Sequence, residues 1–154
     1  MRILIIINST HRQNTIKIAE AMAEAAPLTI VDVNDAELYN VGDYDLVGYG
    51  SGIYGGKFGK KILNHIDKNL NNLKNIFLFS TSGTGKEKYN DGLVEYLNEN
   101  CKNVLGSFAC RGLCKWFIFA LVGGISKGHP DIEDFEAAQT FIEQVMEKYN
   151  KTHN

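Results

Sequence analysis

The sequence has 154 residues, of which 44% are hydrophobic and 22% are charged, values typical of globular domains. This length suffices for a hydrophobic core, and we expect one domain over residues 1–150, followed by a frayed tail over 151–154. A formal net charge of −2 argues against a nucleic-acid-binding protein, which usually carries a basic excess.

The apolar runs argue against a membrane-spanning protein, and the N-terminus and the cysteines argue against a secreted one. The longest apolar run, residues 116–122, is far too short to span a membrane, and no secretory signal is expected at the N-terminus. The chain has an odd number of cysteines, namely Cys101, Cys110 and Cys114. Their number and spacing suggest no framework of paired disulfides, which favours a reducing cytoplasm. Because no second cysteine pair or histidine lies near Cys110 and Cys114, we expect no metal site.

Strand-like apolar runs alternate with stretches of helical periodicity along the chain. The expected strands cover residues 3–7, 28–33, 44–49, 75–80 and 104–111. The expected helices cover residues 16–26, 57–70 and 89–100, with a last helix from residue 130. This last helix opens at Pro130-Asp131, and Asp134 is placed to complete a capping box.

This alternation is typical of the α/β class. We expect an open, doubly wound, parallel sheet of five strands in the order 2-1-3-4-5, with helices on both faces. Apolar runs such as residues 3–7 (ILIII) and 76–79 (IFLF) suit strands that are buried on both sides. The apolar residues 112–129 are expected to be irregular and to pack on the body of the domain, or alternatively to form a lip beside a ligand.

The segment between the first strand and the first helix has the composition of an anion-binding loop. Most of its side chains can donate a hydrogen bond, and one carries a positive charge. The unpaired N–H groups and the dipole of the following helix would also favour an anion. The segment consists of Ser9, Thr10, His11, Arg12, Gln13, Asn14 and Thr15. An ordinary strand–helix turn with a Thr or Asn cap is the alternative.

Two more loops that follow strands are rich in Gly, Ser and Thr, at residues 50–56 and 81–85. In the order 2-1-3-4-5 the first and third strands flank the switch point of the sheet, and the fourth strand lies beside the third. Ligands of doubly wound sheets bind at the carboxyl ends of the strands near this point. The three loops are therefore expected to converge on one crevice.

These segments carry a family resemblance. Ser9-x-x-x-x-Asn14-Thr15, followed by KIAEAM, resembles the phosphate-binding loop of flavodoxin-like proteins. Residues 50–57, Gly-Ser-Gly-Ile-Tyr-Gly-Gly-Lys, and Phe79-Ser-Thr-Ser-Gly83 are similar to the second and third flavin-contacting loops of that family. Gly128-His-Pro-Asp131 resembles the start of the last helix in single-domain members. The resemblance covers essentially the whole chain, with the motifs in the family's order.

The resemblance implies a bound flavin mononucleotide (FMN), with its phosphate at the first loop and its isoalloxazine ring between the other two. The implied cofactor-binding residues are Ser9, Thr10, His11, Arg12, Gln13, Asn14, Thr15, Ser51, Gly52, Ile53, Tyr54, Gly55, Gly56, Thr81, Ser82, Gly83, Thr84 and Gly85. Tyr54 is the candidate for stacking on the ring, unless it rests on its own strand. Gly55 and Gly56 would let a peptide reorient towards the flavin.

The sequence departs from the family at several positions. Gln13 replaces a common glycine, so the backbone there must accept a Cβ or the loop must differ slightly. Gly56 stands where many flavodoxins have an acidic residue. Basic residues surround the loops, namely Arg12, Lys57, Lys60, Lys61, Lys86 and Lys88. Positive charge near the ring would favour its anionic reduced form and make the cofactor less strongly reducing.

The resemblance implies a monomeric electron carrier that takes electrons from one redox partner protein and passes them to another, without catalytic residues. An NAD(P)H-dependent quinone or FMN reductase on the same fold is the alternative. A phosphorylated receiver domain of similar topology is disfavoured, because Ser9 and Thr10 stand where an acidic cluster would hold Mg²⁺.

Overall fold

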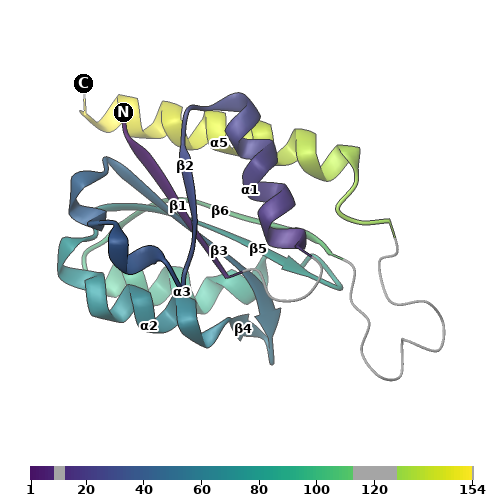
Figure 1. Cartoon of the computed structure of the whole chain (residues 1–154), viewed down its shortest axis with the longest axis horizontal. Helices are drawn as coiled ribbons and strands as arrows, with labels where there is room; N and C mark the ends of the chain where they lie inside the picture. Colours follow the sequence, from purple (N-terminus) through teal and green to yellow (C-terminus); the bar gives the residue numbers. More distant parts are fainter. Residues whose placement is uncertain (9–12, 113–127, 154) are drawn as a thin grey trace.

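A parallel sheet lies between two layers of helices in this computed structural model, which describes residues 1–8, 13–112 and 128–153 (Figure 1). The strands are β1 (Ile3–Asn8), β2 (Thr29–Asp32), β3 (Leu46–Tyr54), β4 (Lys57–Phe58), β5 (Asn75–Ser82) and β6 (Asn103–Arg111). The helices are α1 (Asn14–Ala25), α2 (Lys60–Asn69), α3 (Lys88–Glu99) and α5 (Ile132–His153). Helices α1 and α5 cover one face, and α2 and α3 cover the other.

The strand order is β2-β1-β3-β5-β6, and all neighbours along this path are parallel. The short strand β4 lies off the path and pairs antiparallel with β3. With β4 set aside, the five remaining strands have the predicted order 2-1-3-4-5. The predicted doubly wound α/β fold is therefore confirmed, with one additional two-residue strand.

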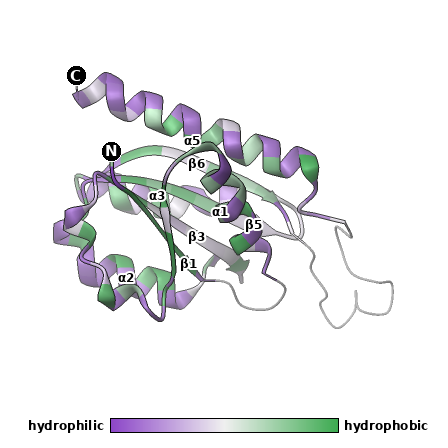
Figure 2. Ribbon diagram, turned by 45° about the horizontal axis from the view of Figure 1, so that its top comes forward, coloured by the Kyte–Doolittle hydropathy of each residue, from purple (hydrophilic) through white to green (hydrophobic). Residues whose placement is uncertain are grey.

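Each face of the sheet has its own hydrophobic core. In β1, Ile5 and Ile7 pack under α1 and α5, whereas Leu4 and Ile6 face the layer of α2 and α3. Successive side chains of a strand point to opposite faces, so a continuous apolar run supplies both cores. Figure 2 shows the resulting green β1 between helices whose outer faces are hydrophilic.

The structure corrects three expected boundaries. Strand β3 continues to Tyr54 through residues expected to form a loop, because its backbone pairs with β1 and β5 as far as residues 51 and 52. Residues 57–58, expected to begin a helix, form β4 instead, and α2 begins at Lys60. The tail expected to fray from residue 151 is helical to His153, whose ring stacks on Tyr149.

The predicted capping box of the last helix is confirmed. The Asp131 carboxylate accepts hydrogen bonds from the backbone N–H groups of Glu133 (3.1 Å) and Asp134 (3.2 Å). In return, the Asp134 carboxylate accepts one from the Asp131 N–H at 2.9 Å. Three backbone donors at the start of α5 are thereby satisfied, which fixes the point where the helix begins.

Helix α2 contains a buried histidine, His65. His65 is 6% exposed, and its Nδ1 is 3.2 Å from the hydroxyl oxygen of Tyr49, which is fully buried. Asn69 donates to the His65 carbonyl at 2.9 Å and its amide nitrogen lies 3.3 Å from Nε2. Desolvation lowers the pKa of His65, opposed by Glu37 and assisted by Lys68.

We expect this histidine to make stability depend on pH. Because its pKa is lower in the folded state, the unfolded chain binds the extra proton as pH falls below about 6.5. The contribution of His65 to the free energy of unfolding should therefore be constant above that pH. Below that pH the free energy of unfolding should decrease as the pH decreases, by at most about 1.4 kcal/mol per pH unit. Urea unfolding between pH 5 and 7.5 measures this slope. His65→Gln should flatten the slope, whereas the exposed-site control His153→Gln should retain it; an unchanged slope in His65→Gln would contradict the prediction.

Candidate functional site

The carboxyl ends of β1, β3 and β5 meet at one edge of the sheet. Asn8 of β1 pairs in register with Ser51 of β3, and Ser51 pairs with Ser80 of β5. Gly52 and Thr81 form the next pair along the edge. The segments that follow these strands therefore begin side by side, as expected for the three loops.

The first loop leads into helix α1. The residues Ser9, Thr10, His11 and Arg12, expected to bind phosphate, lie outside the described part of the chain. Gln13 precedes α1 with φ 57° and ψ 22°, a left-handed conformation that favours glycine, so the departure from the family's glycine places a Cβ in a strained backbone. The first turn of α1 contains no acidic residue, which leaves its positive end free of a competing carboxylate.

A buried hydroxyl pair joins the first and third loops. The Oγ1 atoms of Thr15 and Thr81 are 3.1 Å apart and hydrogen-bonded, and the two residues are only 3% and 5% exposed. Asn14, half-buried at the start of α1, lies so close to Gly112 that a Cβ at Gly112 would come within 2.7 Å of the Asn14 side-chain nitrogen. The start of α1 is thus held against both β5 and the end of β6.

The second loop is a tight hairpin. Gly55 (φ 55°) and Gly56 (φ 79°) connect Tyr54 of β3 with Lys57 of β4, which face each other across the ladder. Two central residues with positive φ are characteristic of the two-residue hairpin turn whose twist matches that of its strands. A Cβ at Gly55 would meet nothing within 4 Å, so bare backbone faces open space at the tip.

The Ser51 hydroxyl anchors this hairpin from within. Ser51 is fully buried; its Oγ accepts the Gly59 N–H at 2.8 Å and donates to the Gly52 carbonyl at 2.6 Å. A Cβ at Gly59 would overlap the side-chain amide of Asn8, so β1 and the start of α2 are also in close approach. The Ser51 side chain therefore positions the loop. Ile53 is half-buried and packs against the core under α2 and α3.

Tyr54 is 46% exposed and lies over its own strand. A Cβ at Gly52 would be 2.9 Å from the Tyr54 hydroxyl oxygen and 3.2 Å from its Cζ. This is the arrangement that the sequence left open as the alternative to ring stacking. A flavin ring at this edge would require the tyrosine either to swing away from Gly52 or to contact the ring with its outer face.

The third loop closes against the end of β6. Ser82 accepts the Gly85 N–H at its Oγ (2.9 Å) and the Gly112 N–H at its carbonyl (2.8 Å). Gly85 has φ 63°, and a Cβ there would lie 3.0 Å from the Arg111 nitrogen. Glycine is therefore required at this position for two reasons, the positive φ and the lack of space for a Cβ. Gly83 is half-buried, and Thr84 is exposed, with its hydroxyl 3.5 Å from that of Tyr89.

The rim of this edge is basic within the described residues. The exposed lysines of the rim are Lys57, Lys60, Lys61, Lys86 and Lys88. Lys61 donates to the Asn34 side chain at 2.6 Å. Acidic residues are absent between Asp45 and Asp67, and again from there to Glu87. Glu87, between Lys86 and Lys88, is the one exposed acidic residue in the stretch from Lys57 to Lys88 apart from Asp67.

Two cysteines and one further polar cluster remain among the described residues, and Cys110 pairs with Thr81 across the β5–β6 ladder. Cys110 is buried, and burial raises the pKa of its thiol, while Cys101 is exposed. Cys114 falls outside the described residues. At the start of α5, His129 Nδ1 lies 2.7 Å from Asp134 and 3.3 Å from Asp131. The contact of His129 with this capping box was not predicted, although the spacing His-x-Asp-x-x-Asp was visible; the capping box and the histidine contacts account for both carboxylates.

Among the described helices, none combines the length and apolar character that crossing a lipid bilayer requires.

Comparisons with known proteins agree with this geometry. Residues 5–112 match the family model described as "Flavodoxin domain". The chain is 35% identical over 148 residues to the uncharacterized protein MJ0298 of Methanocaldococcus jannaschii, covering 95% of this chain and 99% of that protein.

Solved structures show the same fold. A flavodoxin from the domain Archaea matches with a TM-score of 0.72 and 15% identity, over 97% of this chain and 99% of that one. Oxidised flavodoxin 1 from Bacillus cereus matches with a TM-score of 0.69 and 18% identity, over 96% and 98%. At these identities the likeness concerns the fold.

Proposed function

The chain belongs to the flavodoxin domain family, and from this premise we propose that it binds FMN at the carboxyl edge of its sheet and carries electrons between redox partner proteins. The observation that supports this most directly is the joining of the three loops. The Thr15–Thr81 hydroxyl pair links the first loop to the third, and the Ser51–Gly59 bond holds the hairpin beside them.

The residues present fit the phosphate group of such a cofactor. Helix α1 begins at the switch point of the sheet without an acidic residue in its first turn. Helix N-termini bind anions through unpaired N–H groups and the positive end of the dipole. We propose that residues 9–15 hold the phosphate, with the Thr15 hydroxyl as a donor that Thr81 orients.

The hairpin and the third loop fit the ring. Gly55 presents a backbone without a side chain to open space, which allows a flat ring to approach closely, whereas a Cβ at Gly56 would meet the Tyr89 ring at 4.0 Å. We propose that residues 51–56 and 81–85 enclose the ring, with Ser51 as a positioning residue. When bound, FMN would supply the electron-transfer chemistry, which this chain's side chains do not themselves carry out.

The alternative is an NAD(P)H-dependent quinone or FMN reductase. The basic rim favours it to a degree, because the exposed Lys57 and Lys88 would attract the phosphates of a nicotinamide cofactor. A carrier needs no such site, since it exchanges electrons through the exposed edge of its ring.

The purified protein is expected to be yellow and to release FMN on denaturation. Stopped-flow mixing with NADPH should reduce the bound flavin slowly, and addition of a flavodoxin reductase should make the reduction fast. Fast reduction by NADPH alone would contradict the carrier and favour the reductase. A protein that neither contains nor binds FMN would contradict both functions.

A further inference from the structure

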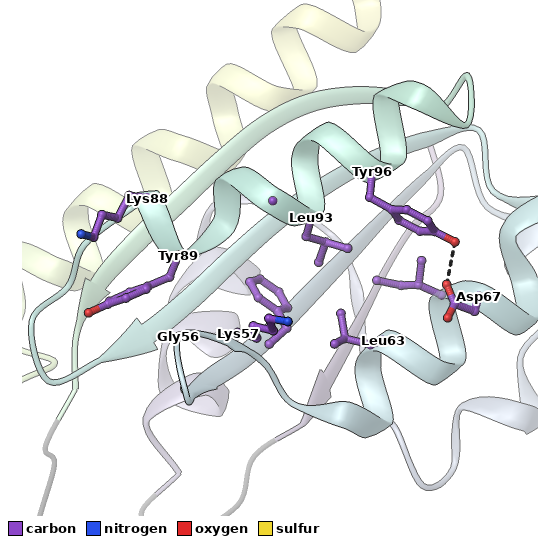
Figure 3. A pocket seen from close by; sticks show the side chains of 11 residues that line it. Gly56, Lys57, Leu63, Asp67, Lys88, Tyr89, Leu93 and Tyr96 are labelled. Carbon is purple, nitrogen blue, oxygen red and sulfur yellow. Dashed lines mark hydrogen bonds between the residues drawn. The ribbon is translucent and has the colours of Figure 1, made fainter.

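A groove runs between helices α2 and α3, beside the hairpin (Figure 3). Its volume is about 470 Å³, within the range of small-molecule sites. Phe58 and Ile66 form part of its lining and are 3% and 0% exposed, and Leu63 and Leu93 add apolar surface from the two helices. The lining is therefore suited to the apolar body of a ligand.

Aromatic rings and bare backbone shape the groove. Tyr89 and Tyr96 line it from α3, and Gly56 lines it from the hairpin. Gly92 of α3 also lines the groove. Glycine inside a helix weakens it, and a Cβ at Gly92 would meet nothing within 4 Å. The missing side chain leaves open space beside two aromatic rings, which suits a flat ligand.

Charge is distributed unevenly along the groove. Lys57 and Lys88 lie towards the hairpin end, and neither ammonium group forms a hydrogen bond or ion pair with the residues that the structure describes. Helices α2 and α3 also begin at this end, so their positive dipole ends add to the two cations. Glu87 at the N-cap of α3 and Asp91 in its first turn are the acidic residues at this end.

The other end of the groove is closed by a hydrogen bond. Tyr96 donates its hydroxyl proton to the Asp67 carboxylate at 2.8 Å, joining α3 to α2 (Figure 3). This bond raises the pKa of Tyr96. The carboxylate of Asp67 is thus engaged within the protein, at the opposite end from Lys57 and Lys88.

We propose that this groove binds a small aromatic anion, such as an aromatic carboxylate, with its negative group at Lys57 and Lys88 and its ring along the apolar lining. The groove is distinct from the edge proposed for FMN, although the hairpin borders both. A ligand seated here would contact the outer side of the hairpin and could influence its conformation.

Titration of ¹⁵N-labelled protein with 2-naphthoate, followed by ¹H–¹⁵N NMR, tests this proposal with and without saturating FMN. The amides of Gly56, Gly92 and Leu93 should shift. Lys57→Met and Lys88→Met should each weaken binding about fivefold, as expected for the loss of one charge near the ligand. Gly92→Leu fills the open space with a side chain, so the ligand loses the volume in which it would lie. This variant should weaken binding more than tenfold.

Three controls make the result decisive. Lys74→Met removes an exposed lysine at the other edge of the sheet and should leave the affinity unchanged. Uncharged 2-naphthamide should bind more weakly than 2-naphthoate. Gly92→Ala should retain the fold and narrow the groove less than leucine does.

Several outcomes would overturn the proposal. These are shifts confined to other residues, equal binding by Gly92→Leu, or lysine variants that bind as the unmodified protein does. Because the titration without FMN does not require the flavin, failure of the proposed function would not alter its result.

Discussion

Replacing Gly50 with alanine should lower the free energy of unfolding by about 3 kcal/mol, at the upper end of overpacking effects. Gly50 pairs with Phe79 across the β3–β5 ladder, and an added Cβ would overlap the phenyl ring. Phe79 is fully buried and stacks on Phe77 at 6.4 Å, so the ring has no room to withdraw. Gly48 stands in the same relation to Phe77.

Urea unfolding measures the effect of Gly50→Ala. Gly92→Ala, at an open helical position, is the matched control and should be neutral or stabilising. Phe79→Leu alone should also lower the free energy of unfolding. Adding Gly50→Ala to Phe79→Leu should recover part of that loss, because the smaller leucine makes room for the new methyl group. If Gly50→Ala were as stable as the unmodified protein, the close packing of glycine and phenylalanine would be refuted.

Replacing Thr15 with valine should weaken FMN binding by about 10- to 100-fold, the range expected when a hydrogen bond to a charged group is lost. Valine retains the shape of threonine and removes only the hydroxyl. Thr15 is 3% exposed, so the shape matters for packing, and the hydroxyl is placed by its bond to Thr81. Quenching of FMN fluorescence during titration measures the dissociation constant.

Two variants separate the possible causes of this effect. Thr81→Val breaks the same hydroxyl pair but leaves the Thr15 donor in place, so it should weaken binding less than Thr15→Val. Thr29→Val, at an exposed position of β2, should have no effect. An unchanged dissociation constant in Thr15→Val would place the phosphate elsewhere, and equal losses in the Thr15 and Thr81 variants would assign the effect to loop geometry.

Much of the fold followed from local patterns. The run at residues 3–7 predicted a strand buried on both sides, and β1 supplies both cores. The parallel pairing followed from the alternation of strands and helices, because parallel neighbours need crossover helices. The alternation alone does not fix the order of the strands, since doubly wound sheets occur in more than one order. The capping box at Asp131 and Asp134 was also predictable, since it depends on residues three apart.

The predicted loops were only partly recognised. Glycine-rich residues 50–54 were expected to form a loop, but they lie in β3, where glycine makes room for phenylalanine rings of the neighbouring strand. The pairing of residues 48 and 50 with residues 77 and 79 depends on strand register. The sequence of β3 alone does not contain that information.

The sequence by itself determined the layers, the parallel sheet and the three polar loops that follow its strands. These features depend on apolar periodicity and on residues that are neighbours in the chain. Only the tertiary structure decided which polar groups are available there. It buries the Ser51 hydroxyl, pairs Thr15 with Thr81, and lays Tyr54 over Gly52. Such contacts depend on how strands and helices pack in three dimensions, and therefore on residues distant in sequence.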